Sequence, residues 1–140
     1  MDADLRQRRL DLLDEHFASE VDQEFDRTIA TFAGHPRYEI VPTGDVYDGE
    51  EEVRGYFAMT REAFPDQRNE IIQLHHMDDG VAAEFTLKGT HKGELRGMPP
   101  TGKEFECRMV ALFLFEPDSD RIVCERVYFD TATILAQLAS

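Results

Sequence analysis

The sequence predicts an α+β domain in which helices come first and a mostly antiparallel sheet follows, so that helices and strands form separate layers. Three observations support this fold class. Apolar residues recur at helical spacing in the first part of the chain, three runs rich in β-forming residues occupy the second half, and turn residues separate those runs. A chain of 140 residues has the usual size of one domain. We therefore expect a single domain over residues 1–140.

Residues 5–32 carry one continuous apolar face at helical spacing. The residues on this face are Leu5, Leu12, Leu13, Phe17, Val21, Phe25, Ile29 and Phe32. Ser19 followed by Asp22 resembles a capping box, which predicts that the stretch is split into two helices. Gly34 and Pro36 favour its end, because glycine accepts the capping conformation and proline disfavours helix in the residue before it.

The next segment is predicted to hold a short strand and a helix. Residues 38–44 have strand character, and Pro42 restricts that strand to an edge or an end. The acidic run Glu50–Glu52 favours the start of a helix, since negative charge is stabilised at the positive end of the helix dipole. Pro65 predicts where this helix stops.

The second half predicts four long strands and a final helix. The β-rich runs lie at 69–92, 103–116 and 121–130, and Asp78-Asp79-Gly80 divides the first run into a hairpin. Apolar residues then resume at helical spacing in 131–138.

Alternation within two of the strands predicts which face looks inward. In the strand from Val81 the inward set is Val81, Ala83, Phe85, Leu87, Gly89 and His91. In the strand from Lys103 it is Phe105, Cys107, Met109, Ala111, Phe113 and Phe115. The opposite face of this second strand is also apolar towards its end, at Val110, Leu112 and Leu114. Such a pattern is expected if the outer face of the sheet meets another subunit.

Charge and composition restrict the partners. The formal net charge is -14, from 15 basic and 29 acidic residues, so the average field repels phosphate backbones and anionic lipid heads. We expect neither nucleic acid nor a membrane as partner. The amino terminus is charged from its second residue and lacks the pattern of a secretory signal, which predicts a cytoplasmic location.

No metal site is expected. His75-His76 and Asp78-Asp79 offer ligand atoms, but adjacent strand residues point to opposite faces, so the two histidines cannot chelate one ion together. Cys107 and Cys124 are too far apart in sequence for a redox or zinc motif, and we expect both to be free thiols.

Two strings carry a family resemblance: GTHKGELRGMPPTGK (89–103) and ERVYFDTATILAQL (125–138). They resemble the SnoaL-like polyketide cyclase or ester cyclase family, within the nuclear transport factor 2-like superfamily. The likeness extends over essentially the whole chain and includes FPDQRNEI (64–71). It implies a cone in which a curved, mostly antiparallel sheet wraps around the N-terminal helices and encloses a pocket for a small, largely apolar molecule. It also implies a homodimer through the outer face of the sheet.

The resemblance further implies chemistry without metal or cofactor. In such cyclases an aspartate on the closing strand, beside a histidine on the preceding strand, removes a proton next to a carbonyl. Asp130 stands where such an aspartate could be. The sequence has no histidine after His91, so the strand at 103–116 cannot supply the histidine and the mechanism does not transfer intact.

Asp130 and His91 are the candidate catalytic residues. Asp130 follows Ile122, Cys124, Arg126 and Tyr128 in alternation. If that face lines the pocket, burial raises the pKa of Asp130 towards that of a general base, while Arg126 lowers it. Asp130 also suits the N-cap of the last helix, and the two roles are compatible. His91 either relays a proton from the rim of the inward face or bonds the adjacent loop at 98–102.

Other residues are candidates for binding the substrate. Tyr47, Tyr56 and Tyr128 could donate a hydrogen bond to a developing oxyanion or bond a backbone carbonyl instead. Met59, Phe85, Met98, Cys107 and Met109 either line the pocket or belong to the core, and Arg126 completes the set. The sequence thus predicts a cofactor-free cyclase, isomerase or lyase with Asp130 as base. The alternative is a module that binds a ligand, or serves as a structural dimer, without catalysis.

Overall fold

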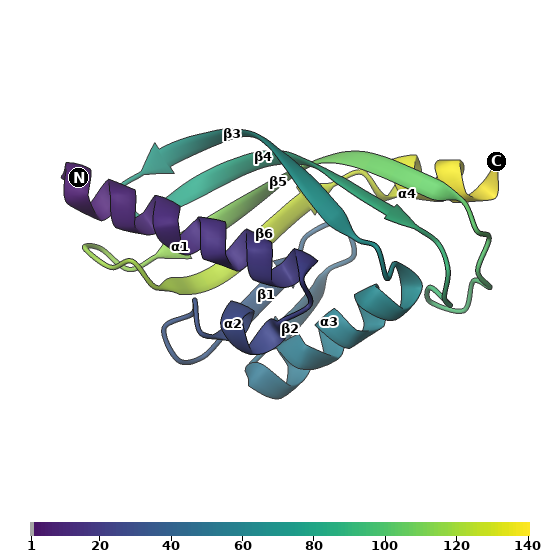
Figure 1. The fold of residues 1–140 in the computed structure, drawn as a ribbon, viewed down its shortest axis with the longest axis horizontal. Coiled ribbons are helices and arrows are strands. Elements are labelled where there is room, and N and C mark those ends of the chain that lie inside the picture. Colours follow the sequence, from purple (N-terminus) through teal and green to yellow (C-terminus); the bar gives the residue numbers. More distant parts are fainter. Residues whose placement is uncertain (1) are drawn as a thin grey trace.

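The computed structural model describes residues 2–140 and confirms the α+β class. The elements are α1 (Ala3–Val21), α2 (Phe25–Ile29), β1 (Arg37–Ile40), β2 (Asp45–Asp48), α3 (Glu50–Ala63), β3 (Arg68–Met77), β4 (Gly80–Thr90), β5 (Glu104–Phe115), β6 (Ile122–Phe129) and α4 (Thr131–Ala139). The strands arch over the first three helices, which lie together on the concave side of the sheet (Figure 1). Within residues 2–140, no helix combines the length and the hydropathy needed to cross a membrane.

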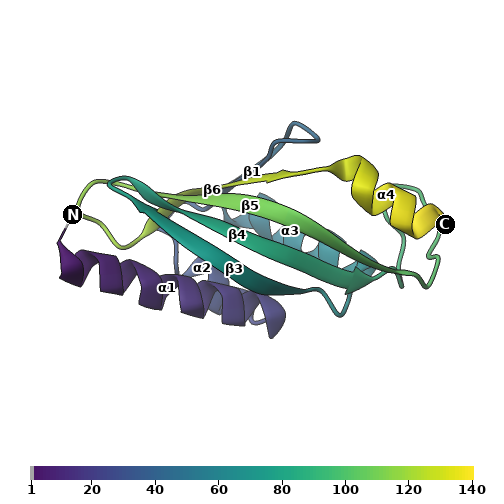
Figure 2. The ribbon, with the colours of Figure 1, turned by 90° about the horizontal axis from the view of Figure 1, so that it is seen from above.

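One six-stranded sheet has the order β2-β1-β6-β5-β4-β3 and does not close into a barrel. β1 runs parallel to β6, and every other neighbouring pair is antiparallel. α4 continues beyond the end of β6 and lies near the C terminus, at the opposite end of the molecule from the start of α1 (Figure 2). The sheet is therefore covered by helices from two separate parts of the chain.

The predicted inward faces of β4 and β5 are confirmed. Every member of the β5 set is buried, as are Val81, Ala83 and Phe85 of β4. Register then fixes the faces of β6, because residues paired across neighbouring strands share a face. Phe113 pairs with Glu125 and Met109 pairs with Phe129, so the inner face of β6 carries Glu125 and Phe129.

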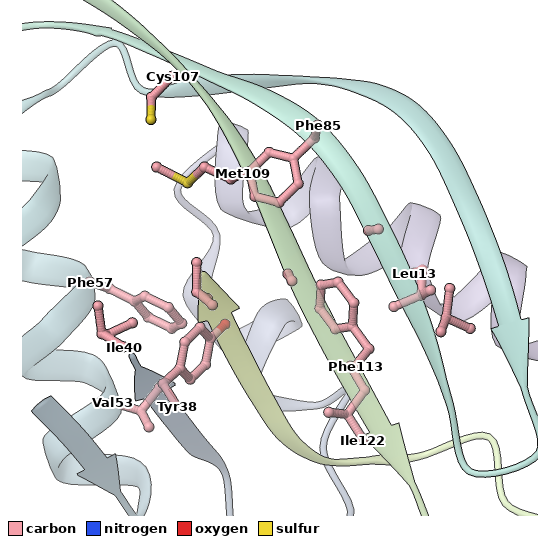
Figure 3. Packing of buried hydrophobic residues seen from close by; sticks show 14 of the residues in the cluster. Leu13, Tyr38, Ile40, Val53, Phe57, Phe85, Cys107, Met109, Phe113 and Ile122 are labelled. Carbon is pink, nitrogen blue, oxygen red and sulfur yellow. The ribbon is translucent and has the colours of Figure 1, made fainter. Parts of the chain in front are cut away.

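The core lies between this inner face and the helices. Phe85, Met109 and Phe113 project from β4 and β5 towards Tyr38 of β1 and Phe57 of α3 (Figure 3). Tyr38 and Phe57 meet edge to face with their ring centroids 5.4 Å apart, a favoured arrangement for aromatic pairs. Large rings thus fill the space under the arch of the sheet.

Three local predictions differ from the structure. The strand expected at 38–44 ends at Ile40, and β2, which the sequence did not predict, follows it as the edge strand. β2 has only four residues, too few for a recognisable alternation. The N-terminal stretch does divide into two helices, but Ser19 does not cap the second one. Its hydroxyl donates to the carbonyl of His16 within α1, so the helix continues to Val21.

Arg9 is a buried cation on the same face of α1 as Leu5 and Leu13, where it interrupts the apolar pattern. Its side chain is fully buried, and its guanidinium lies over the ring of Phe115, 4.6 Å from the centroid. The guanidinium donates to carbonyls in the β3–β4 and β5–β6 connections, at distances of 2.9 to 3.3 Å. The acceptors are Met77, Asp78, Glu116 and Ser119. Arg9 therefore fastens the start of α1 to two turns of the sheet.

We expect Arg9→Met to lower the free energy of unfolding by about 3 kcal/mol, because it leaves buried carbonyls without donors. Arg6→Met is the matched control, since Arg6 is an exposed residue of the same helix, and it should change the free energy by less than about 0.5 kcal/mol. Urea unfolding measures both. Equal effects of the two substitutions would contradict the anchoring role of Arg9.

Candidate functional site

An apolar cavity of about 410 Å³ lies under one end of the sheet. Its walls come from β1 and β2, from the inner faces of β4 to β6, from α3 and α4, and from the loop between β4 and β5. They include Tyr47, Tyr56, Met59, Leu87, Leu95, Met98, Phe105, Met109, Val127, Phe129, Ile134 and Leu135. A volume of this size is typical of pockets that bind small molecules. The cavity is therefore the candidate binding site.

A second, smaller cavity of about 50 Å³ adjoins the first and shares Tyr56, Met109 and Val127 with it. Its remaining walls are more polar, because Glu20, Tyr38, Arg61 and Glu125 also line it. The two spaces together form an apolar chamber with a polar inner end. We call the smaller space the inner cavity.

Glu125 is one of two glutamates that line the inner cavity, and Glu20 is the other. Glu125 lies on the inner face of β6 and is only 6% exposed. Burial raises the pKa of the Glu125 carboxyl, as does the nearby charge of Glu20, and the hydrogen bond from His16 only partly offsets this. A carboxyl with a raised pKa, next to an apolar chamber, has the properties of a general base.

His16 of α1 fixes the position of Glu125. Its Nε2 atom is 2.9 Å from Oε1 of Glu125, and its Nδ1 atom is 2.9 Å from Oγ1 of Thr31. The Thr31 hydroxyl donates to the carbonyl of Thr28, so it accepts from His16 and assigns a proton to Nδ1. Nε2 is then the atom that shares a proton with Glu125.

Glu20 and Arg61 complete the charge balance. Nε2 of His16 is 3.5 Å from Oε2 of Glu20, and Nη2 of Arg61 is 3.8 Å from Oε1 of the same carboxylate. Burial by itself would raise the pKa of Glu20, but the charges of His16 and Arg61 outweigh it and lower the pKa. Burial would likewise lower the pKa of His16, but Glu20 and Glu125 raise it to about 10. The inner end therefore holds an ionised Glu20 between two cations.

Tyr38 and Tyr56 add phenol groups to the same region. The Tyr38 hydroxyl is 3.3 Å from Nε2 of His16 and donates to Glu20 over 3.4 Å. Burial raises the pKa of both phenols. Both are therefore neutral donors at ordinary pH.

Six of the substrate-binding candidates lie at these cavities. Tyr47, Tyr56, Met59, Met98 and Met109 line the larger cavity, and Phe85 lines the inner one. Cys107 is on the inner face of β5 but lines neither cavity. Its Sγ atom lies near the carbonyls of Arg108 and Asp130.

The position of Asp130 corrects the expected orientation of the last strand. Because Glu125 and Phe129 face inward, the alternate residues Arg126 and Tyr128 face outward, and neither they nor Asp130 line either cavity. Asp130 is the N-cap of α4: its carboxylate accepts from the backbone N–H of Ala132 at 3.0 Å and from the Thr133 hydroxyl at 2.9 Å.

Arg126 and Tyr128 are correspondingly engaged on the outer surface. Nε of Arg126 donates to Oε1 of Glu39 at 2.6 Å, and Tyr128 is 41% exposed. His91 is fully buried and lines neither cavity. Its Nδ1 atom accepts from the backbone N–H of Thr101 at 3.3 Å. Of its two expected roles, the structure has the one in which His91 bonds the adjacent loop.

Sequence reasoning missed the polar inner end, although two signals for it were present. In β6 the alternation has a second set, Val123, Glu125, Val127 and Phe129, which is more apolar than the set ending at Asp130 and contains a single carboxylate. In α1, His16 and Glu20 are four residues apart, which puts them on one side of a helix. A histidine from α1 thus lies beside Glu125, although no histidine follows His91 in the sequence.

His16, Glu20 and Glu125 also form a group of ligand atoms within 4.8 Å of one another. Such a group could chelate a cation in principle. In this fold, however, His16 hydrogen bonds through both ring nitrogens and Arg61 already neutralises Glu20. A metal ion would have to displace the proton of His16 and approach the charge of Arg61. The arrangement suits proton transfer better than metal binding.

Protonation of His16 should make stability depend on pH. Its pKa in the folded protein, about 10, lies above its ordinary value of 6.5. The resulting stabilisation is complete below pH 6.5 and is lost as the pH rises through 10. Between about pH 7 and 9, the free energy of unfolding of the wild type should therefore fall, relative to that of His16→Gln, by about 1 kcal/mol per pH unit. Urea unfolding at several pH values measures this difference. Parallel profiles would show that His16 is not held as a cation.

Comparison with known proteins places this arrangement in a family. The family model of SnoaL-like polyketide cyclases matches residues 14–138. Among solved structures, a candidate SnoaL-like polyketide cyclase from Jannaschia sp. CCS1 is 18% identical, with 96% of this chain and 93% of that chain covered and a TM-score of 0.85. No match was found among curated proteins.

Two further structures resemble this chain. IdmH, a candidate polyketide cyclase from Streptomyces antibioticus, is 25% identical over 94% of this chain and 99% of its own, with a TM-score of 0.79. A protein from Catenulispora acidiphila with a ketosteroid isomerase-like fold, solved with trimethylamine, is 20% identical over 91% of this chain and 92% of its own, with a TM-score of 0.78. The architecture is thus nuclear transport factor 2-like, and the chain belongs to the SnoaL-like polyketide cyclase family.

Proposed function

We propose that the protein binds a small, largely apolar carbonyl compound in the cavity and removes a proton next to the carbonyl, without a cofactor, as a cyclase or isomerase. Glu125 is the general base. The observation that carries this proposal is a buried carboxyl with a raised pKa at the polar inner end of an apolar chamber. A base of this kind is most effective when its pKa lies near the working pH.

The proposed reaction moves one proton and one electron pair, and both stay within the protein and the substrate. A C–H bond next to the carbonyl breaks, its proton forms an O–H bond on Glu125, and the electron pair moves into an enolate. In isomerisation of an unsaturated ketone, the conjugated enolate takes the proton back from Glu125 at a different carbon. In cyclisation, the enolate carbon attacks a second carbonyl of the same molecule, and the oxygen of that carbonyl takes the proton from Glu125 as the new C–C bond forms. His16 holds the Glu125 carboxylate through Nε2 during these steps. Neither outcome requires an oxidant or a reductant.

The comparisons support this class of reaction, since IdmH and the Jannaschia protein are both described as candidate polyketide cyclases. The apolar walls favour a small apolar metabolite as the partner. The catalytic roles of Asp130 and His91 remain predictions from the sequence. The geometry favours Glu125 over Asp130, because Glu125 lines the inner cavity and Asp130 caps a helix on the other side of the strand.

Hydrogen exchange tests the role of Glu125 with any ketone that fits the cavity. A panel of apolar ketones is incubated with the protein in D₂O, and NMR follows deuterium uptake at the carbon next to the carbonyl. Glu125→Gln should slow this exchange by about 10²-fold or more, with ketone affinity changed by less than about threefold. Asp130→Asn is the matched control, because asparagine also caps helices, and it should exchange at the wild-type rate.

Each other outcome has a clear meaning. Loss of exchange in Asp130→Asn but not in Glu125→Gln would restore Asp130 as the base. Binding of ketones by the wild type without any exchange would support the alternative function, a binding module without catalysis. A wild type that binds none of the ketones would contradict the proposed substrate class.

We also propose a homodimer through the outer face of the sheet. Val110, Leu112 and Leu114 of β5 lie on this face beside Tyr128 of β6, according to their register. Tyr128 is among the exposed large hydrophobic residues. An apolar patch of this kind is typical of a subunit interface.

Sedimentation analysis should find a dimer for the wild type. Leu112→Arg should convert it to a monomer, because a charge would be buried at the interface without a partner. Val46→Arg, at an exposed position on the edge strand β2, should leave the dimer intact. A wild type that sediments as a monomer at micromolar concentration would rule out this interface.

A further inference from the structure

Arg61 lies in the last turn of α3 and lines the inner cavity. The residue is 8% exposed. Nη1 donates to the Thr60 hydroxyl at 2.9 Å, and Nη2 donates to the carbonyl of Glu20 at 3.2 Å. The Nε atom is buried and has no hydrogen-bond partner among the described residues. Leaving a buried N–H of a charged group without an acceptor lowers the stability of the fold, so the unpaired Nε–H of Arg61 requires an explanation.

The position of Arg61 is firmly determined by its neighbours. Its guanidinium carbon is 5.3 Å from the ring centroid of Phe25 and 6.0 Å from that of Phe57. These rings and the bond to Glu20 restrict the guanidinium to one orientation. The free Nε–H is thus held in a fixed orientation, on a residue that lines the inner cavity.

The charges around Arg61 leave room for one more anion. Arg61 and His16 are cations, while Glu20 is a carboxylate with a lowered pKa. When Glu125 takes up a proton it becomes neutral, and the cluster then holds two positive charges and one negative charge. The negative charge that Glu125 has given up would be carried by the substrate. A buried cation with a free donor is the group that stabilises such a charge.

We propose that Arg61 is an oxyanion receptor: its Nε–H binds the carbonyl oxygen of the substrate in the inner cavity and stabilises the enolate oxygen after proton removal. This assignment rests on the proposed function. It narrows the substrate class to apolar molecules that carry a carbonyl at one end, because the inner cavity of about 50 Å³ holds a group of one or two water-sized units but not a ring. The apolar body occupies the larger cavity.

Naphtholate is a suitable probe, since it is an apolar anion that carries its charge on an oxygen like an enolate. The absorbance spectrum of 2-naphthol distinguishes the ionised from the neutral form, and the protein has no tryptophan to interfere. Titration with wild-type protein, below the pH at which free naphthol ionises, should give the spectrum of the bound anion. The naphtholate anion should bind more tightly than naphthalene, which has the same rings but no oxygen.

Two substitutions test the role of Arg61. Arg61→Met should weaken binding of the naphtholate anion by about 10- to 100-fold, as expected for loss of a charged hydrogen bond, and leave naphthalene binding within about threefold. Arg61→Lys keeps a positive charge beside Glu20 but has no Nε–H, and it should lose about 10-fold. If Arg61→Met does not fold, the Arg61→Lys variant still tests the role of the Nε–H group. Arg54→Met, on the same helix but 40% exposed and paired with Asp26, is the matched control.

The outcomes separate this proposal from the proposed function. If folded Arg61 variants bind naphtholate as tightly as the wild type, or if the wild type does not prefer the anion to naphthalene, Arg61 is not an oxyanion receptor. Deuterium exchange that depends on Glu125 would still stand in that case. Conversely, naphtholate binding that depends on Arg61, in a protein that exchanges no ketone, would support the receptor and contradict catalysis.

Discussion

The hydrogen bond between His16 and Glu125 joins the first helix to the last strand, and the interior is organised around it. Both groups are buried, so the hydration that each loses on folding is offset by the hydrogen bond between them and by the polar groups around them. The pairing therefore requires α1 to lie under the sheet at a fixed height and rotation. Thr31 fixes the far side of the imidazole, and Glu20 and Arg61 balance its charge. Any shift of α1 along the sheet would leave several buried charges without partners.

The second attachment of α1 has a different chemistry. Arg9 binds backbone carbonyls in two turns, whereas His16 binds a side chain in the middle of β6. One attachment sets where the helix starts on the sheet, and the other sets which of its sides faces the cavity. Together they explain why a helix with few large apolar residues on its buried side lies so closely against the sheet. Buried polar groups here give orientation, while aromatic rings supply most of the buried area.

Most of the fold could be predicted from the sequence, because alternation and turn residues are local signals. The strands β3 to β6 and the inward faces of β4 and β5 followed from such patterns. The candidate site could not be predicted in the same way. The members of its polar inner end come from α1, α3, β1 and β6, and the register of β6 decides whether Glu125 or Asp130 faces inward. In β6 both alternating sets contain a carboxylate, so periodicity alone does not choose between them.

The family resemblance pointed to Asp130 at the end of the last strand, whereas the buried carboxyl beside the cavities, Glu125, lies on the opposite face of that strand. Arg126 and Tyr128 were expected at the pocket because they alternate with Asp130, and the structure has them on the outer face of β6. Cys107 is on the predicted inner face of β5 but does not line the larger cavity. Buried polar residues such as Arg9 and His16 escape an apolar periodicity because they interrupt it. A histidine was absent where the resemblance required one, and a residue from the first helix, far earlier in the chain, occupies the place beside the carboxyl.

Because α4, the helix that Asp130 caps, lines only the apolar end of the chamber, the two ends differ in how readily their residues can be substituted. The polar end depends on side chains from four elements, and a change in any of them disturbs the others. The apolar end includes Ile134 and Leu135 from α4, a helix of nine residues that supplies no side chain to the polar end. Substitutions in that segment can change the width and shape of the chamber without altering the charges beside Glu125. Variation in α4 could therefore change which molecules fit the chamber while the charged groups around Glu125 stay as they are.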